Sequence, residues 1–290
     1  MVDVDELLEI FEEIKPPKAV EEPPREEPRE DSSKIAKGFL IRYYSASNFI
    51  EYLKLFKELS DEVTFEVSKD GLRTQFMDPA KITLIKFKLD TYAFEEFDYP
   101  DEPVRFTINV KSLLKSLPRK IEPRSFIVIE GHDDALKVTI HGPSGEIVSE
   151  VEPPLLELEN WSDYTIKGWS IEAAVRLNAP ALYQAVKTVK GVWDKVALIA
   201  CDDGFALEKD DEEGKAKAVF TREDPRLYDL EINNEVRVLM DSKYLEGLLK
   251  HVKKLADEVK LSMANRKPLI VEAYIPGGEI TYYQAPIVED

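Results

Sequence analysis

The sequence predicts an α+β protein made of two similar halves, in which helices cover one face of the sheets. Two observations predict this class. After residue 37, segments with the period of strands outnumber segments with the period of helices, and the order of these segments recurs later in the chain. The length of 290 residues suits two domains of ordinary size. We therefore expect a repeated domain.

The first half, residues 37–151, is rich in β-branched and aromatic residues, which pack well on a pleated surface. Two of its segments instead carry apolar residues at helical spacing: 47–58, which follows the capping candidate Ser47, and 111–118, which stops at Pro118. The remaining segments are predicted strands: 39–46, 63–68, 72–77, 82–89, 104–110, 126–130, 136–141 and 146–151.

The second half, residues 169–290, repeats this order. A predicted helix at 180–191 precedes a predicted strand at 196–201, as 47–58 precedes 63–68, and an Asp-Gly turn follows each strand. Further on, helix 242–254 precedes strand 259–263. Residues 152–168 form the linker between the halves, because Pro153 and Pro154 cannot continue a strand ladder. We expect the linker to lie extended along a sheet.

Residues 1–36 differ from the rest of the chain. They contain twelve acidic and five basic residues, and therefore carry −7 of the net charge of −18. Residues 3–14 place Leu7, Leu8, Phe11 and Ile14 at helical spacing, which predicts a short helix. The proline- and charge-rich stretch that follows has little to bury, which predicts a disordered tether. We expect the helix to bind a partner or to dock on the body.

Composition excludes several classes of protein. A net charge of −18 excludes a protein that binds nucleic acid through an overall positive charge, but not one with a local basic stripe. A single cysteine, Cys201, excludes an intrachain disulfide framework and a multi-cysteine zinc site. The acidic N-terminus and the lack of a long apolar run predict a cytosolic protein with neither a targeting peptide nor a membrane span.

No constellation of catalytic residues is found. His132, His141 and His251 have neither a nucleophile beside them nor metal-ligand spacing. The acidic residues 210–213 lack the order of a calcium loop and are read as a solvated hairpin tip. Glycine-rich phosphate-binding motifs are also absent from the sequence. We therefore expect a protein that is not an enzyme and that needs no cofactor and no metal.

Basic residues are concentrated on the predicted helices. Any one of these helices has the polar face of an ordinary solvated helix, but four basic helices in an acidic protein predict a positive surface. Such a surface contacts phosphates without reading bases. The candidate DNA-facing residues are Lys54, Lys57, Lys111, Lys115, Arg119, Lys120, Lys187, Lys190, Lys243, Lys250, Lys253 and Lys254.

Two motifs resemble a known family. The first comprises residues 61–67 (DEVTFEV) followed by 70–73 (DGLR) and 76–79 (FMDP), and the second is the C-terminal sequence YYQAPIVED at 282–290. Together they resemble the archaeal and eukaryotic sliding clamps of the proliferating cell nuclear antigen type, over about residues 38–290. Residues 1–36 are an addition to the family pattern. Pro153, Pro154 and Trp161 also depart from it.

The resemblance implies two clamp domains per chain, with sheets outside and helices lining a ring. Three chains would encircle duplex DNA, without sequence preference and without catalysis, in an archaeal cytosol close to the nucleoid. The implied partners are DNA polymerase, clamp loader, flap endonuclease and DNA ligase. Ring contacts would pair residues 145–151 of one subunit with 214–221 of the next. The implied client-binding residues are Met77, Lys81, Ile82, Leu155, Leu156, Leu158, Ala285, Pro286 and Ile287.

Three alternatives remain open from the sequence. The chain is either one subunit of a homotrimer or a specialised paralogue in a heterotrimeric or damage-responsive ring. From a different class, an acidic protein-interaction scaffold with no DNA role would use the basic helices to bind acidic partners. The apolar residues assigned to client binding also suit ordinary core and linker packing. A hydrolase is disfavoured by the lack of a nucleophile–base pair.

Overall fold

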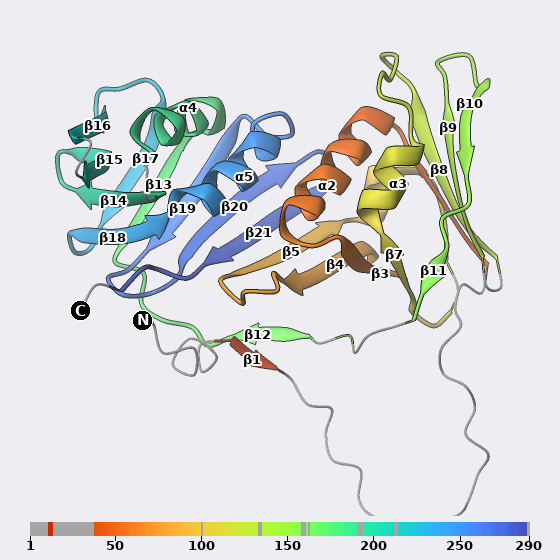
Figure 1. The fold of residues 1–290 in the computed structure, drawn as a ribbon, viewed down its shortest axis with the longest axis horizontal. Helices are drawn as coiled ribbons and strands as arrows, with labels where there is room; N and C mark the ends of the chain where they lie inside the picture. The colour runs from red at the N-terminus through yellow and green to blue at the C-terminus, as the bar shows by residue number, and fades with distance from the viewer. Residues whose placement is uncertain are drawn as a thin grey trace, which may run out of the picture.

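The computed structural model describes residues 11–13, 38–99, 101–132, 135–157, 161, 163–190, 194–211 and 214–288. The two halves lie side by side, with the helices gathered on one face of the strands (Figure 1). We call this side of the molecule the helix face and the opposite side the open face. The strands β1 (Phe11–Glu13) and β12 (Tyr164–Ile166) lie on the open face.

The first half begins at β2 and ends at β10. Its elements are β2 (Phe39–Tyr43), α2 (Ala46–Leu59), β3 (Glu62–Ser68), β4 (Gly71–Met77), β5 (Thr83–Leu89), the 3-10 turn η1 (Thr91–Ala93), β6 (Phe94–Asp98), β7 (Val104–Asn109), α3 (Val110–Ser116), β8 (Phe126–His132), β9 (Ala135–His141) and β10 (Ile147–Val151).

The linker contains β11 (Leu155–Leu156) and β12, and the second half follows. Its elements are β13 (Ala173–Asn178), α4 (Ala179–Val189), β14 (Lys195–Cys201), β15 (Gly204–Asp211), β16 (Gly214–Thr221), β17 (Leu227–Ile232), β18 (Val236–Asp241), α5 (Ser242–Val252), β19 (Glu258–Met263), β20 (Leu269–Ile275) and β21 (Gly278–Gln284). The order from β13 to β21 repeats the order from β2 to β10, which confirms the repeat expected from the sequence.

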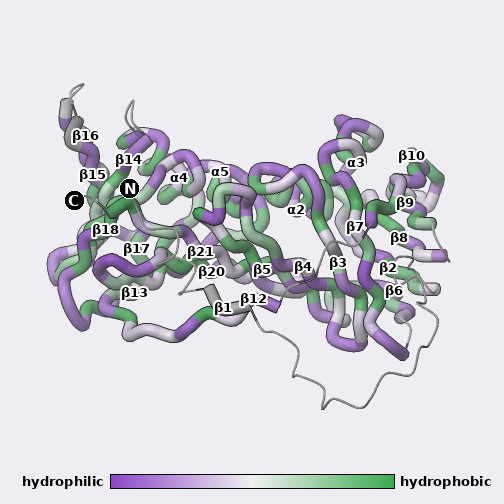
Figure 2. The backbone as a smooth tube through the Cα atoms, turned by 60° about the horizontal axis from the view of Figure 1, so that its bottom comes forward, coloured by the Kyte–Doolittle hydropathy of each residue, from purple (hydrophilic) through white to green (hydrophobic). Residues whose placement is uncertain are grey.

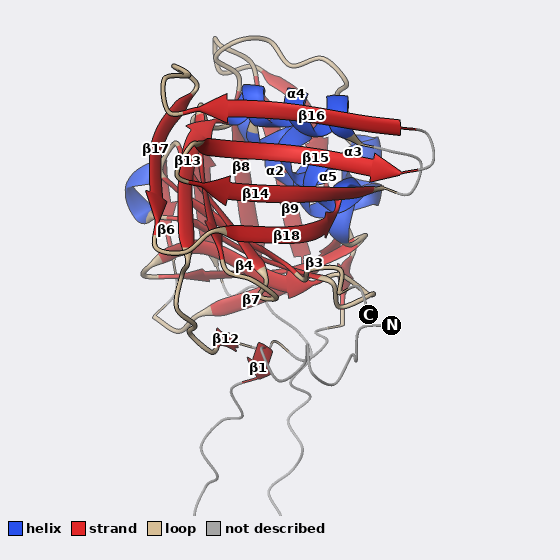
Figure 3. Ribbon diagram, turned by 90° about the vertical axis from the view of Figure 1, so that its left-hand side faces the viewer, coloured by secondary structure: helices blue, strands red, loops and turns tan. Residues whose placement is uncertain are grey.

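The strands form three large sheets and one small one. A ten-stranded sheet, ordered β11-β7-β3-β4-β5-β21-β20-β19-β13-β17, runs through both halves. The halves join where β5 pairs antiparallel with β21, from Thr83 opposite Gln284 to Leu89 opposite Gly278. A five-stranded sheet (β10-β9-β8-β2-β6) and a four-stranded sheet (β16-β15-β14-β18) flank it. Figure 3 shows β16 as the outermost strand of the four-stranded sheet.

The helices start with the same local device, a polar side chain that caps the first turn. Asn109 Oδ1 accepts a hydrogen bond from Ser112 N in α3, and Asn178 Oδ1 accepts one from Ala181 N in α4. Ser45 caps α2, two residues before the predicted cap Ser47, and Asp241 caps α5. These caps satisfy backbone donors that the helix itself leaves free. The helices predicted for residues 47–58, 111–118, 180–191 and 242–254 are confirmed.

The core lies between the helices and the sheets. In the first half the rings of Phe39 and Phe65 each stack on Phe106, with centroids 5.4 Å apart. The buried hydroxyls of Tyr43 and Tyr52 are 3.0 Å apart, which satisfies both inside the core. Figure 2 shows hydrophilic and hydrophobic residues alternating along the helices, as expected of elements buried on one side.

Two sequence expectations need correction. Residues 11–13 form the strand β1 and not part of a helix, because their backbone pairs with β12; residues 1–10 and 14–37 lie outside the described residues. Strand β6 was not predicted. Its phenylalanines, Phe94 and Phe97, are separated by two glutamates, so the segment lacks the alternation that marks a strand.

A substitution at Gly278 tests the close packing between β5 and β21. A Cβ atom at this position would lie 1.9 Å from the carbonyl oxygen of Lys88, a backbone atom that cannot rotate away. Gly278→Ala should therefore lower the free energy of unfolding by about 2 kcal/mol or more, measured by urea unfolding. The control is Gly168→Ala, where nothing lies within 4 Å. Equal effects of the two substitutions would contradict the close approach.

Candidate DNA-facing and client-facing surfaces

Each of the helices presents basic side chains on the side turned away from the sheets. Lys57 on α2 and Lys115 on α3 are exposed and form no ion pair with a described residue. Lys253 Nζ lies 3.6 Å from the ring centroid of Tyr183, and Lys187 Nζ lies 5.7 Å from it, so this ring attracts two cations. Arg119, Lys120 and Lys243 are also exposed and have no ion-pair partner in the part of the chain that the structure describes.

Five of the candidate lysines form ion pairs with nearby carboxylates. Glu51 binds both Lys54 (3.3 Å) and Lys254 (2.7 Å). The remaining pairs are Lys250–Glu58 (2.9 Å), Lys190–Glu246 (2.9 Å) and Lys111–Asp61 (2.7 Å). These five lysines share four carboxylates, and the other seven candidate cations form no ion pair with a described residue.

Lys243 occupies a different position from the other lysines. It lines a hollow of about 340 Å³ with Pro79, Ala80 and Tyr244, at the turn between β4 and β5. This hollow borders both the helix face and the segment that carries Lys81. Lys243 is therefore at the rim of the helix face and not in its middle.

His251 joins α5 to α2 across the boundary between the halves. Its side chain is 3% exposed, with Nδ1 2.6 Å from Glu51 Oε1 and Nε2 3.2 Å from Glu58 Oε1. Each ring nitrogen lies within hydrogen-bonding distance of a different glutamate, so His251 bridges Glu51 and Glu58. The sequence placed His251 on a helix without assigning it a partner, and its position between two glutamates became visible only in the fold.

The same contacts shift the titration of both glutamates. Burial raises the pKa of Glu51, but hydrogen bonds from His251 and Lys254 outweigh it and lower the pKa from 4.5 to about 2. Burial likewise opposes the shift at Glu58, whose pKa is lowered by hydrogen bonds from Lys250 and His251. The ionised carboxylates therefore stabilise the contact between α2 and α5.

Part of the predicted client site is brought together by the β5–β21 pairing. The C-terminal tail follows β21 past the β4–β5 turn, where Ala285 N donates to Ile82 O (2.9 Å). Beyond it, Ile287 N donates to Leu239 O (2.7 Å). Met77, Ile82 and Ile287 are half-buried and Lys81 is exposed, whereas Ala285 and Pro286 are buried. The turn and the tail thus form one surface.

Asp78 organises that turn. Its buried carboxylate accepts hydrogen bonds from Ile82 N (2.8 Å), Thr83 N (2.6 Å) and Ala80 N (3.1 Å). These bonds hold the chain through Lys81, which has a φ of 56°. Because a positive φ is unfavourable for a residue with a side chain, the Asp78 network stabilises this conformation.

The linker residues lie elsewhere. Leu155 and Leu156 form β11, which pairs with Ile108 and Thr107 of β7 at the far edge of the ten-stranded sheet. Strands β7, β3 and β4 separate β11 from β5, so these leucines do not join the surface formed by Ile82 and the tail. Leu158 lies outside the described residues.

A cluster around Trp161 anchors the later part of the linker to the open face. Trp161 lies against two guanidinium groups, with its ring centroid 5.3 Å from Arg73 and 4.9 Å from Arg105. Both arginines bind the buried Glu66, at 2.5 and 2.7 Å. Asp163 accepts hydrogen bonds from Gln75 (2.7 Å) and Trp161 (3.2 Å). Sequence reasoning noted Trp161 as a departure but did not find this anchor.

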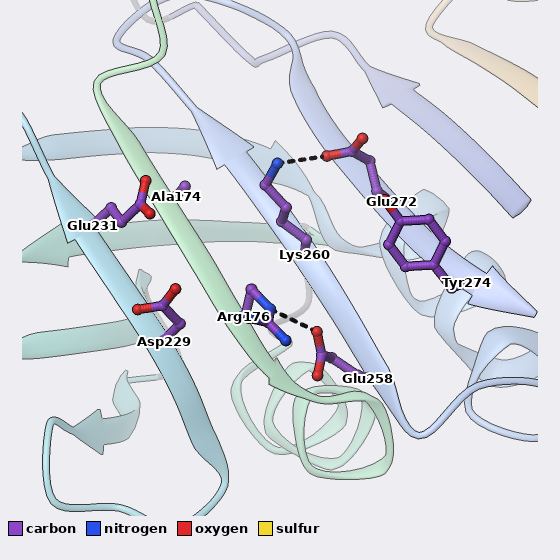
Figure 4. A pocket seen from close by; sticks show the side chains of 8 residues that line it. All are labelled: Ala174, Arg176, Asp229, Glu231, Glu258, Lys260, Glu272 and Tyr274. Atoms are coloured by element: carbon purple, nitrogen blue, oxygen red, sulfur yellow. Dashed lines mark hydrogen bonds and ion pairs between the residues drawn. The ribbon is translucent and has the colours of Figure 1, made fainter.

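The open face of the second half carries a charged hollow of about 410 Å³ (Figure 4). Arg176 on β13 binds Glu258 on β19 at 2.7 Å, and Lys260 binds Glu272 on β20 at 3.2 Å. Asp229 and Glu231 on β17 line one side of the same hollow, and Tyr274 on β20 lines the other. These charges pair across neighbouring strands, which is typical of a solvated sheet face.

Among the described residues, no group of three or more His, Cys, Asp or Glu side chains is arranged to hold a metal ion. In the same part of the chain, no helix is long and apolar enough to cross a membrane.

Two strand edges lie at opposite ends of the molecule (Figure 1). Strand β10 ends the five-stranded sheet and exposes Ile147 (62%) and Val148 (49%). Strand β16 ends the four-stranded sheet and exposes Val219 (48%). In the internal repeat, β16 corresponds to β5 and β10 corresponds to β21. The two edges are therefore the counterparts of the strands that join the halves.

Comparisons with known proteins agree on one kind of protein. Residues 39–163 match the family model of the proliferating cell nuclear antigen, N-terminal domain. Over 253 residues, 87% of this chain, the sequence is 28% identical to the DNA polymerase sliding clamp of Pyrococcus furiosus and 27% identical to DNA polymerase sliding clamp 1 of Thermococcus kodakarensis, covering 99% of each relative. A crystal structure of PCNA from Thermococcus kodakaraensis matches with a TM-score of 0.78 and 25% identity, covering 86% of this chain and 100% of that one.

The fold defined by these features is that of a DNA clamp: two repeated α+β domains joined edge to edge, with all the described helices on one face. The chain is thus similar to DNA polymerase sliding clamps over most of its length, and residues 39–163 match the N-terminal domain of the proliferating cell nuclear antigen family.

Glu51 allows a test of the contact between α2 and α5. A carboxyl whose pKa is lowered by folding contributes stability above its unfolded pKa and loses it as the pH falls toward the folded pKa. With a pKa of about 2 instead of 4.5, Glu51→Gln should lower the free energy of unfolding by about 2–3 kcal/mol at pH 7. The difference from the unsubstituted protein should shrink between pH 4.5 and 2, measured by urea unfolding. Glu223→Gln, at an exposed position, is the control; a difference that does not change with pH would contradict the assignment.

Proposed function

We propose that this chain is the subunit of a trimeric ring that encircles duplex DNA and tethers DNA polymerase to it, without catalysis of its own. The proposal rests on one observation: the two strands at the free ends of the molecule are the repeat counterparts of the two strands that pair at its centre. Within the chain, β5 pairs with β21, and their counterparts β16 and β10 are free at opposite ends. Repeating the internal junction between chains pairs β16 of one subunit with β10 of the next.

A contact of this kind joins two different surfaces, so it produces a closed ring when the rotation between subunits completes a circle. The charges of the two edges favour a second copy of this chain as the neighbour. Glu146 and Glu150 lie at the β10 edge, and Lys215 and Lys217 lie on β16. The exposed apolar residues Ile147, Val148 and Val219 would be covered in the same contact. A homotrimer therefore suits both edges.

The helix face supports binding to DNA. Exposed lysines on the helices would line the opening of the ring, where they screen phosphates without contacting bases. Several are held by carboxylates on the same face, which weakens each phosphate contact. Weak, sequence-independent contacts suit a ring that moves along the duplex. The β4–β5 turn and the C-terminal tail, on one surface, are the proposed docking site for polymerase and for clamp loader, flap endonuclease and DNA ligase.

The ring is tested by measuring solution mass. The chain should give three times its 33.2 kDa mass by light scattering, and Ile147→Glu combined with Val148→Glu should shift it to monomer at the same concentration, because two charges would be placed in an apolar contact. Tyr274→Glu, on an exposed residue of β20 (74%) away from both edges, should leave the trimer intact. A monomeric unsubstituted chain would contradict the homotrimer and favour a ring with paralogous subunits.

DNA binding is tested on the helices. Lys57→Glu combined with Lys115→Glu should reduce affinity for a fluorescent duplex at least tenfold and lower the slope of log affinity against log salt. The matched control is Lys69→Glu with Lys267→Glu, at two exposed lysines in turns between strands. Equal loss in both variants would mean that net charge, and not the helix face, governs binding. No affinity of the unsubstituted protein for duplex DNA would favour the scaffold alternative.

A further inference from the structure

The N-terminal extension reaches the linker as a strand. β1 pairs antiparallel with β12, with Phe11 opposite Ile166, Glu12 opposite Thr165 and Glu13 opposite Tyr164. Among the described strands these two form a sheet of their own, on the open face of the molecule (Figure 1). A two-stranded sheet has little stability by itself. The pairing therefore depends on what holds each strand in place.

β12 is held by the anchor that precedes it. Trp161 lies against Arg73 and Arg105, and Asp163 is bonded to Gln75. Directly at β12, Lys86 Nζ donates to the carbonyl oxygen of Tyr164. These contacts fix the start of β12 on β4 and β5, so that the edge that pairs with β1 is held in one orientation. A fixed strand with a free edge accepts an extended peptide through main-chain hydrogen bonds.

β1 is held by the covalent chain. Residues 14–37 connect it to the body, and at about 3.4 Å per residue they span up to roughly 80 Å, which is ample for the return to the linker. A tether of this kind maintains an effective concentration on the order of millimolar. A free peptide would therefore need a high concentration or a higher affinity to take the same edge.

The charges of the two segments also favour the placement of β1 beside β12. The segment that ends in β1 contains six carboxylates and no lysine or arginine over residues 1–13. The anchor holds the cations Arg73, Lys86 and Arg105 together with the carboxylates Glu66 and Asp163, so one positive charge is in excess there. This excess favours an acidic strand beside the anchor.

We propose that the N-terminal segment is an intramolecular ligand of the linker, and that β1 occupies the edge of β12 at which an extended peptide of a partner would otherwise add a strand. A partner that uses this edge must first displace β1. The pairing itself does not depend on the proposed function; the identification of the displaced partner as a client of the clamp does.

Cross-linking in the full chain tests the pairing. Glu12→Cys and Thr165→Cys place thiols on directly opposite residues, in a background of Cys201→Ser. Mild oxidation should convert most of the protein to an intramolecular disulfide, seen as a faster band on a non-reducing gel. Glu12→Cys with Ser170→Cys is the control and should cross-link at least fivefold less. Equal yields, or covalent dimers in place of the internal link, would overturn the proposal.

Competition tests occupancy of the edge. A fluorescent peptide copying residues 5–16 should bind at least tenfold more tightly to a chain lacking residues 1–36 than to the full chain. The shortened chain retains every described helix and every described strand except β1, so it is expected to fold. A scrambled peptide of the same composition has the same charge but a different residue order, so weaker binding of this peptide would show that strand pairing, and not charge alone, drives binding. Equal affinity for both chains, or for both peptides, would contradict the proposal, whatever the oligomeric state or the DNA affinity of the ring.

Discussion

The antiparallel pairing of β5 with β21 is the contact on which the rest of the structure depends. It turns two separate domains into one ten-stranded sheet. As a result the helices of both halves share one face, and the C-terminal tail emerges beside the β4–β5 turn. Both surfaces combine residues distant in sequence. The close approach of the Gly278 backbone to Lys88 is the local condition for this joint.

The helix face shows how an acidic protein maintains a positive surface. Glu51, Glu58, Asp61 and Glu246 each form an ion pair with a lysine of this face. Glu51 and Glu58 also bind His251, which links the charges of the face to the contact between α2 and α5. The same residues thus serve the surface and the joint between the halves. An isolated surface ion pair contributes little to stability, but a partly buried network contributes more.

Much of this fold could be predicted from the sequence. Local periodicity was sufficient for the helices, because residues such as Leu53 and Leu249 recur on one side of each, and the recurring order of elements indicated the two halves. Contacts between distant residues could not be predicted in the same way. Nothing near His251 in the sequence indicates Glu51, 200 residues away. Trp161 stood out as unusual, but its place between Arg73 and Arg105 depends on how β4 and β7 lie in the sheet.

Where the structure differs from the sequence prediction, the segment pairs through its backbone with a neighbouring strand. The apolar spacing of Phe11 suits a helix, yet residues 11–13 gain their hydrogen bonds from β12. Leu155 and Leu156 likewise pair with β7 and do not join the tail. Short segments with weak intrinsic preference adopt the conformation that a nearby strand edge offers.

Glu51 and Glu58 bind both the lysines of the helix face and His251, and this limits which lysines can be substituted during evolution. Lysines that share these carboxylates, such as Lys250 and Lys254, cannot be replaced without disturbing the boundary between the halves. Lys57 and Lys115 form no ion pair with a described carboxylate, so replacing them would leave this boundary intact. Selection for looser or tighter attachment to the double helix is therefore free to act on the second pair, while the first is kept by the demand for a stable subunit.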